Sequence, residues 1–195
     1  MNTVSNVAAG KPKVGGAIWT APVGTTLPTD ATTALDAAFE CLGYCSEDGL
    51  TNESELDTDV VKAWGGDEVL ITGNGRSDRF SYTLIEVLNV AVLKHVYGKD
   101  NVTGTLADGI HVKVNGKDTE DVSIVAELVL RGALKRIVVP RAHVTEVGEI
   151  AYTDGDVVGY ETTVTALPDE DGDTHHEYIK TAPAASSSAT TGGST

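Results

Sequence analysis

The chain has 195 residues, of which 41% are hydrophobic and 5% aromatic, and its 29 acidic and 14 basic side chains give a formal net charge of −15. This composition excludes a broadly disordered chain, a nucleic-acid binder that holds phosphates with lysine and arginine, and a transmembrane helix, since no apolar run approaches about 20 residues. Valine, threonine and glycine are plentiful, which favours β-structure with many turns.

The first quarter of the chain predicts an arm, two strands and a loop. Residues 1–16 are small and polar and lack the apolar centre of a signal peptide. We therefore expect an arm that becomes ordered on a partner and no secretion by that route. Residues 17–20 predict a strand, residues 21–35 a loop with prolines and threonines, and residues 37–46 a strand that ends at the turn Asp48-Gly49.

Both cysteines, Cys41 and Cys45, fall within that second strand. Four residues along a strand span about 13 Å at ~3.3 Å per residue, which exceeds the ~7 Å Cα separation that a disulfide allows. We expect two free, mostly buried thiols on one face of the strand, as in a protein made in a reducing compartment.

The middle of the chain carries the clearest local signals. Residues 51–63 are acidic without a clean period and predict a long loop or an extended hairpin. In residues 67–87, two strand-like runs flank Asn74-Gly75, a dipeptide typical of a tight hairpin turn. A helical period follows and predicts a helix within 84–98 that ends at a C-cap glycine. Its apolar positions are Ile85, Leu88, Val92 and Val96.

The remainder of the chain is again β-like. Residues 122–130 place alternate apolar side chains on one face, and Arg131-Gly132 turns the chain into a further strand. From Thr181 the sequence is a low-complexity tail of alanine, serine, threonine and glycine. We therefore predict three parts, listed here as an N-terminal arm (1–16), a β-domain (17–180) and a C-terminal tail (181–195).

A search for chemistry finds no pattern that favours catalysis. The acids between positions 47 and 68 lie among polar residues and turns, whereas a catalytic carboxylate pair needs one desolvated member, so we interpret them as a solvated face. "GNGRSD" (73–78) lacks the third glycine of a dinucleotide-binding loop. We expect no enzyme, no catalytic residue and no cofactor.

The segment "DEDGDTHHE" (169–177) invites a metal-binding interpretation. Its glycine falls at the wrong position for an EF-hand loop. Its adjacent histidines, His175 and His176, would point to opposite faces of a strand and cannot chelate together. We expect a turn followed by a surface strand, and no metal.

Five segments together resemble the major tail tube proteins of long-tailed bacteriophages. Each is weak alone, but their order and spacing are specific over about residues 15–180. Cys45 stands where the family pattern favours a small β-branched residue. The segments are "LGYCSEDG" (42–49), "AWGG" (63–66), a helix between Ile85-Glu86 and Tyr97-Gly98, "GYETTVTA" (159–166) and "HHEYI" (175–179).

The resemblance implies a mainly β fold, an antiparallel β-sandwich or small barrel flanked by one α-helix, with an extended N-terminal arm and a long loop. It implies a virion protein, made in the host bacterial cytoplasm, whose copies form rings, usually hexameric, that stack into the tail tube. The implied partners are the tape-measure protein and the tail tip and tail terminator proteins. DNA would pass through the lumen without specific binding, and no membrane is involved.

The resemblance also suggests a purpose for the acidic segment. We expect it to reach a neighbouring subunit, with Trp64 as an apolar anchor, although Trp64 as a plain core residue stays open. Since acidic side chains repel phosphates, we also expect a mainly negative lumen. The predicted inter-subunit contacts are Glu47, Asp48, Gly49, Glu53, Glu55, Asp57, Asp59, Trp64, Gly65 and Gly66.

Two other classes of protein compete with a tube subunit. A monomeric β-sandwich module that binds, for example, carbohydrate should show exposed aromatic side chains on one face, and aromatic residues are scarce here. A hydrolase with an acid pair needs a desolvated carboxylate, which the sequence does not indicate.

Overall fold

The computed structural model describes residues 2–182, so nearly all of the predicted tail lies outside the described residues. Besides two short 3-10 turns, η1 (Val4–Asn6) and η2 (Lys99–Asn101), it contains one α-helix in the described range, α1 (Val90–Tyr97). The strands are β1 (Gly10–Pro12), β2 (Ile18–Pro22), β3 (Glu40–Cys41), β4 (Cys45–Lys62), β5 (Glu68–Leu84), β6 (Val102–Thr103), β7 (His111–Val112), β8 (Val122–Leu130), β9 (Ala133–Val147), β10 (Tyr160–Ala166) and β11 (His176–Thr181).

Nine of the strands form one antiparallel sheet in the order β3-β2-β8-β9-β10-β5-β4, with β1 added beside β8 and β11 beside β9. Strands β6 and β7 form a small separate ladder. The prediction of a mainly β fold with one α-helix is confirmed, and the sheet stays open. No helix in residues 2–182 has the length and apolarity to cross a membrane.

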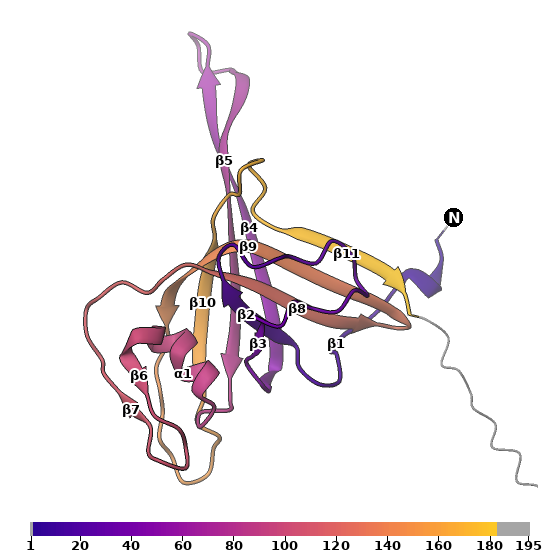
Figure 1. Ribbon diagram of the computed structural model, residues 1–195. Helices are drawn as coiled ribbons and strands as arrows, with labels where there is room; N and C mark the ends of the chain where they lie inside the picture. Colours follow the sequence, from indigo (N-terminus) through magenta and orange to yellow (C-terminus); the bar gives the residue numbers. More distant parts are fainter. Residues whose placement is uncertain (1, 183–195) are drawn as a thin grey trace, which may run out of the picture.

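The main core lies between one face of the sheet and α1 (Figure 1). Alternate residues of the central strands point into it, because side chains on a strand alternate between faces. A smaller cluster on the opposite face of β8 and β9 joins Val125 and Val138 to Phe39 of the loop between β2 and β3. Members of the main core include Phe80, Tyr82 and Leu84 of β5, Ile124 and Ala126 of β8, Val164 of β10, and Val92, Leu93 and Val96 of α1.

The helix is shorter than its apolar period predicts. It begins only after Asn89, whose side-chain oxygen accepts a hydrogen bond from the N–H of Ala91 at 3.0 Å. The preceding Glu86 accepts from the N–H of Tyr44 at 3.0 Å, which holds residues 85–89 in a tertiary contact instead of a first helical turn. The predicted C-cap is confirmed, since Gly98 follows the helix with φ 88°.

The prediction of a hairpin turn at Asn74-Gly75 is wrong. Strand β5 continues through this dipeptide. The pairing shifts register between Asp57 and Thr58 of β4, so β5 has one extra residue at this point. The chain turns instead at residues 63–67, where the N–H of Ala63 donates to the carbonyl of Asp67 at 2.8 Å. Gly65 and Gly66, at φ 119° and 99°, supply the left-handed backbone that this turn needs.

The strand predicted over 37–46 is wrong as one continuous element, since residues 40–41 belong to β3 and residues 45–46 to β4. Only Glu40–Cys41 pairs with β2, and the chain then bends at Gly43, which has φ 74°. The two cysteines are free, as expected, but they are half-buried and lie on different strands rather than on one face. Burial raises the pKa of the Cys45 thiol to about 11, so this thiol is a poor nucleophile at neutral pH.

A buried ion pair that sequence reasoning missed joins β8 to β9. Glu127 and Arg136 are 5% and 1% exposed and form a direct salt bridge, to which Lys13 adds a second cation at 2.9 Å. Arg136 also donates to the carbonyls of Asp30 and Thr33 at 2.7 and 2.9 Å. The pair therefore ties the loop between β2 and β3 to the sheet and satisfies charges that would otherwise be costly to bury.

Part of the predicted N-terminal arm forms a strand of the chain's own sheet. Strand β1 pairs with the end of β8, where Gly10 lies opposite Leu130. Arg131 at the β8–β9 turn donates to the carbonyls of Val4 and Val7 at 2.8 and 3.3 Å. The arm thus contacts the body before any partner binds.

Candidate assembly surface

Strands β4 and β5 form a long hairpin that projects from the body (Figure 1). Strand β5 pairs with β10 only from Asp78 to Leu84. Beyond Asp78, β4 and β5 therefore have only each other as sheet neighbours within residues 2–182. An isolated two-stranded hairpin is marginally stable in water, so the distal half of this hairpin gains most from a partner.

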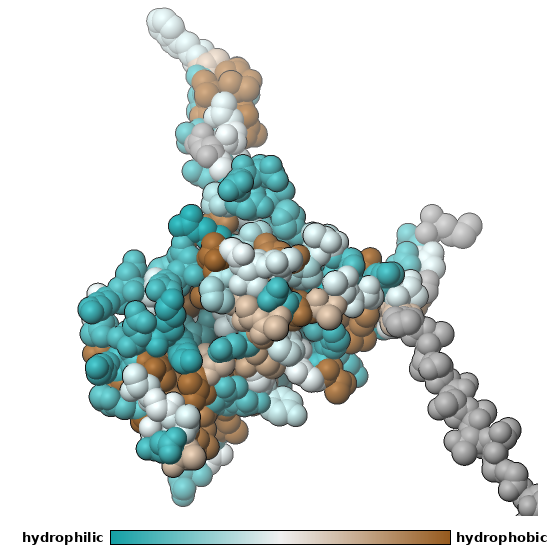
Figure 2. All heavy atoms as spheres, in the orientation of Figure 1, coloured by the Kyte–Doolittle hydropathy of each residue, from teal (hydrophilic) through white to brown (hydrophobic). Residues whose placement is uncertain are grey.

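The distal half of the hairpin exposes apolar side chains. Figure 2 shows the aliphatic ones as a brown group just behind the pale outer end of the projection. Soluble monomers rarely expose a contiguous apolar patch of this kind unless it binds another surface. We call this set the apolar tip; its members, with exposed fractions, are Leu56 (65%), Val60 (43%), Val61 (45%), Trp64 (107%), Val69 (60%), Leu70 (54%) and Ile71 (64%).

Trp64 with Gly65 and Gly66 forms the turn at the very end of the hairpin. The indole is fully exposed, so the alternative that Trp64 is a core residue is wrong. A large apolar ring at the end of a projecting hairpin is well placed to anchor an interface, because aromatic side chains dominate the energetics of buried contacts.

Four of the predicted acids lie on one face of the hairpin. Glu53, Glu55, Asp57 and Asp59 occupy alternate positions of β4, which places them on the same side. Arg79 lies directly opposite Glu53 in the ladder. These acids and the apolar tip are therefore parts of one element. The acids were expected at a contact because of the family resemblance, and Trp64 was the one member of the apolar tip that was expected there.

The other three predicted residues lie away from the tip. Glu47, Asp48 and Gly49 are at the foot of β4, in an irregular stretch between the pairs Cys45–Leu84 and Leu50–Tyr82. Gly49 has φ 75°, as a bulged strand permits for glycine. The predicted contact set is thus divided between the two ends of one strand.

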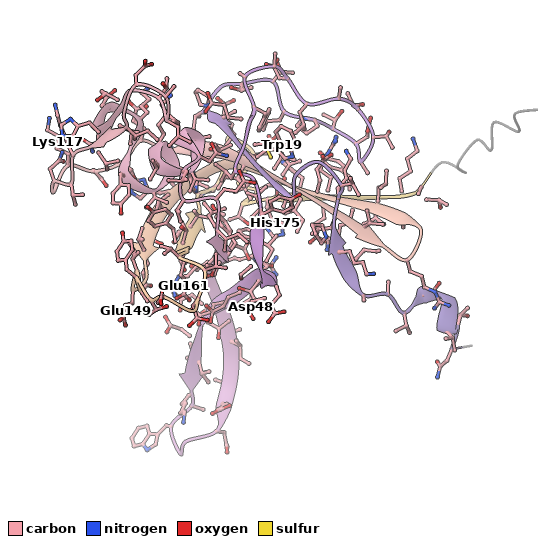
Figure 3. The ribbon with its side chains drawn as sticks, turned by 90° about the horizontal axis from the view of Figure 1, so that it is seen from below. Trp19, Asp48, Lys117, Glu149, Glu161 and His175 are labelled. Carbon is pink, nitrogen blue, oxygen red and sulfur yellow. The ribbon has the colours of Figure 1, made fainter. Side chains whose placement is uncertain are left out.

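The acidic face of the hairpin continues across the sheet as a polar surface. Ser81 and Thr163 face each other across β5 and β10 with hydroxyls 2.8 Å apart, and Thr145 and Thr165 do so across β9 and β10 at 3.1 Å. Glu161 lies opposite Thr83 on the same face. Figure 3 shows Glu161 near Asp48 and Glu149 along one side of the molecule.

We call this surface the polar face; it consists of the outward side chains of β4, β5, β10 and the end of β9. Hydroxyls and carboxylates dominate it, and Arg79 is a basic member. Its net charge is negative, because Glu53, Glu55, Asp57 and Glu161 outnumber that arginine.

Sequence reasoning identified Trp64 but missed the other members of the apolar tip. The signal was present in "VV" (60–61) and "VLI" (69–71), which flank the turn symmetrically. Apolar residues at consecutive positions point to both faces of a strand, and both faces can be apolar only if something covers them. The misplaced turn at Asn74-Gly75 hid this symmetry.

A free-standing hairpin with an apolar tip, an 18-residue strand β4 paired on one side, and a polar outer face define a subunit built to contact other protein chains. A family model described as "Phage tail tube protein" matches residues 4–191, and the chain belongs to this family. Membership implies a structural component of the virion tail that assembles with copies of itself.

The search of curated proteins finds no match. Among solved structures, the chain is similar to the tube-terminating cap of the anti-feeding prophage, studied by cryo-electron microscopy. That similarity has 12% sequence identity and a TM-score of 0.40, and it covers 93% of this chain and 100% of the cap chain.

Proposed function

We propose that copies of this chain form stacked hexameric rings that build the tail tube through which DNA passes into the host. The observation that carries the proposal is the apolar tip on a free-standing hairpin in a member of the tail tube family. The tape-measure protein, the tail tip and the tail terminator are the proposed partners inside and at the two ends of the tube.

Within a ring, the exposed edge of β4 offers backbone N–H and C=O groups to a neighbouring copy. Strand β11 also pairs on one side only, with β9. Pairing the edge of one copy with the edge of the next would extend the sheet around the ring through the same backbone hydrogen bonds that join strands within one copy. Such a contact joins two different surfaces of neighbouring copies. Repeating it produces a closed ring when the rotation between one copy and the next divides a full turn evenly.

The hairpin extends well beyond the body and is proposed to cross to a neighbouring copy. Trp64 and the aliphatic side chains around it would be buried there. Removing apolar surface from water contributes about 25 cal/mol per Å², so a single buried indole contributes a large part of the contact energy. The same burial would stabilise the otherwise marginal distal ladder.

The polar face is the proposed lining of the channel. Carboxylates on it repel the phosphates of passing DNA, and hydroxyls offer no fixed positive charge to hold them. Replacing Glu53 and Glu55 by lysine would place a basic ring at every level of the tube. We expect such tubes to retain DNA at low salt in a filter-binding assay, whereas wild-type tubes do not. Equal retention by both would show that this face does not line the lumen.

Assembly is tested with the full chain and a single substitution, Trp64→Ala. Negative-stain microscopy of the wild type, alone or with the tape-measure protein, should show rings or filaments. The variant should show few or none, with an unchanged circular dichroism spectrum. Val114→Ala, which shortens another exposed side chain far from the hairpin in sequence, is the matched control and should assemble normally. A wild type that stays monomeric with the tape-measure protein present would refute the proposal.

A further inference from the structure

The turn between β10 and β11 brings together three potential metal ligands. Carboxylate oxygens of Asp169 and Asp173 and an imidazole nitrogen of His176 all lie within 4.8 Å of one another. His176 Nε2 is 3.4 Å from Asp169 Oδ2. The sequence argued against a metal because His175 and His176 cannot chelate together; the fold instead turns His175 toward Asp78 and His176 toward the two aspartates.

The spacing matches what a small divalent cation requires. Bonds of about 2.0–2.2 Å in a tetrahedral site place two ligand atoms roughly 3.4 Å apart. The Asp169–His176 pair already has this separation. The other ligand-atom pairs lie no more than 4.8 Å apart, and Asp173 is exposed, so its side chain is free to rotate toward the other two.

The turn holds one ligand in place without a metal. Asp169 Oδ1 accepts hydrogen bonds from the N–H groups of Asp171 and Asp173 at 3.0 and 2.9 Å. These two bonds hold the Asp169 carboxylate in one orientation. Its other oxygen, Oδ2, is the one that faces His176.

Asp78 of β5 holds the chain between two of the ligands. Its side chain is fully buried. Its Oδ2 accepts from Thr174 and lies 3.3 Å from His175 Nδ1. Thr174 and His175 are the two residues between Asp173 and His176, so their contacts with Asp78 help to hold the chain in the path that brings the ligands together.

We propose that Asp169, Asp173 and His176 bind one divalent transition-metal ion of the zinc type. Two carboxylates and one imidazole suit such an ion, whereas Ca²⁺ and Mg²⁺ prefer oxygen ligands throughout. Three protein ligands leave a position for water or for a group from another chain. The ion would fix the β10–β11 turn, which contacts Asp78 of β5 through Thr174 and His175.

The test is calorimetric titration of the full chain, treated with a chelator and then dialysed, with ZnCl₂. We expect one saturable site per chain. Asp173→Asn and His176→Gln should each weaken binding by at least about tenfold. Zn²⁺ should also raise the melting temperature of the wild type and shift the His176 imidazole ¹⁵N resonance.

Glu170→Gln is the matched control, since it removes an acid of the same turn that is outside the ligand set. Its affinity should stay within about twofold of the wild type, because loss of one exposed charge changes only a screened interaction. Absence of a saturable site would overturn the proposal. So would equal weakening by Glu170→Gln and His176→Gln, which would show diffuse attraction to an acidic chain. Binding is measured on unassembled chains, so this result is independent of tube formation.

Discussion

Gly43 and Glu86 show at the residue scale how the family-like segment "LGY" is fixed. The Glu86 carboxylate accepts from the N–H of Tyr44 and lies against Gly43, where an added Cβ would be 2.1 Å from Glu86 Cδ. Leu42 beside it is fully buried in the core. The segment therefore needs glycine both for its left-handed backbone and for the space the carboxylate fills.

Gly43→Ala should destabilise the fold more than Gly49→Ala. The two glycines have nearly the same φ, 74° and 75°, but nothing lies within 4 Å of a Cβ at Gly49. Backbone strain costs both variants about 1 kcal/mol, and overpacking against Glu86 should cost Gly43→Ala about 2 kcal/mol more. Urea unfolding measures both, and equal losses would contradict the contact.

His95 makes stability depend on pH. It is fully buried in α1, its Nε2 lies 2.7 Å from the Tyr82 hydroxyl, and burial lowers its pKa from 6.5 to about 4. The unfolded chain therefore takes up a proton first, and the contribution of His95 is present above pH 6.5 and lost as pH falls toward 4. Between pH 7 and 5.5 this should remove about 1.2 kcal/mol.

The measurement compares urea unfolding at pH 7 and 5.5 for the wild type and His95→Gln. Other groups titrate equally in both proteins, so the difference between the two pH dependences isolates His95. The variant should show the smaller loss. A pH dependence identical to that of the wild type would show that His95 does not titrate in this range.

At the scale of elements, the Glu127–Arg136 pair decides how the loop between β2 and β3 is held. Arg136→Met should cost about 3–5 kcal/mol, because it leaves the Glu127 carboxylate buried beside Lys13 alone. Replacing both residues by methionine should recover much of this loss, since no charge is then left buried. Free energies of unfolding in urea test both, and a double variant no more stable than the single one would contradict the account.

The elements also show which sequence signals carry reliable information. Arg131-Gly132 was correctly predicted as the β8–β9 turn, and both residues have positive φ, 42° and 97°. Asn74-Gly75 carries an equally good local signal, yet the long ladder with β4 overrides it and moves the turn to "AWGG". Likewise, the apolar period begins near residue 84, but the helix begins only after Asn89. Residues 85–89 contact residues 42–44 instead of forming a first helical turn.

The candidate surfaces were less predictable than the fold. Trp64 and the acids could be found from the sequence, because a tryptophan between glycines and a run of carboxylates is conspicuous. The polar face required the ladder register, which depends on where the turn lies. The Asp169–Asp173–His176 group required the path of the turn before β11, which no residue spacing encodes.

At the scale of the whole molecule, the core, the polar face and the apolar contact surface lie in different parts of the fold. One face of the sheet and α1 hold the core, the opposite face of β4, β5 and β10 is polar and acidic, and the hairpin carries apolar surface away from both (Figures 1 and 2). This separation lets a small domain be stable while its interaction surfaces stay exposed. It also explains why the strong negative charge of the chain is compatible with apolar contacts between copies.

The most direct test of the central claim is a cryo-electron microscopy map of the assembled chain. We expect the hairpin of each copy to lie against another copy, with Trp64 and Leu70 buried at the contact and the side chains of Glu53 and Glu55 facing the channel. Rings or tubes in which the hairpin projects freely into solvent, with Trp64 uncovered, would contradict it.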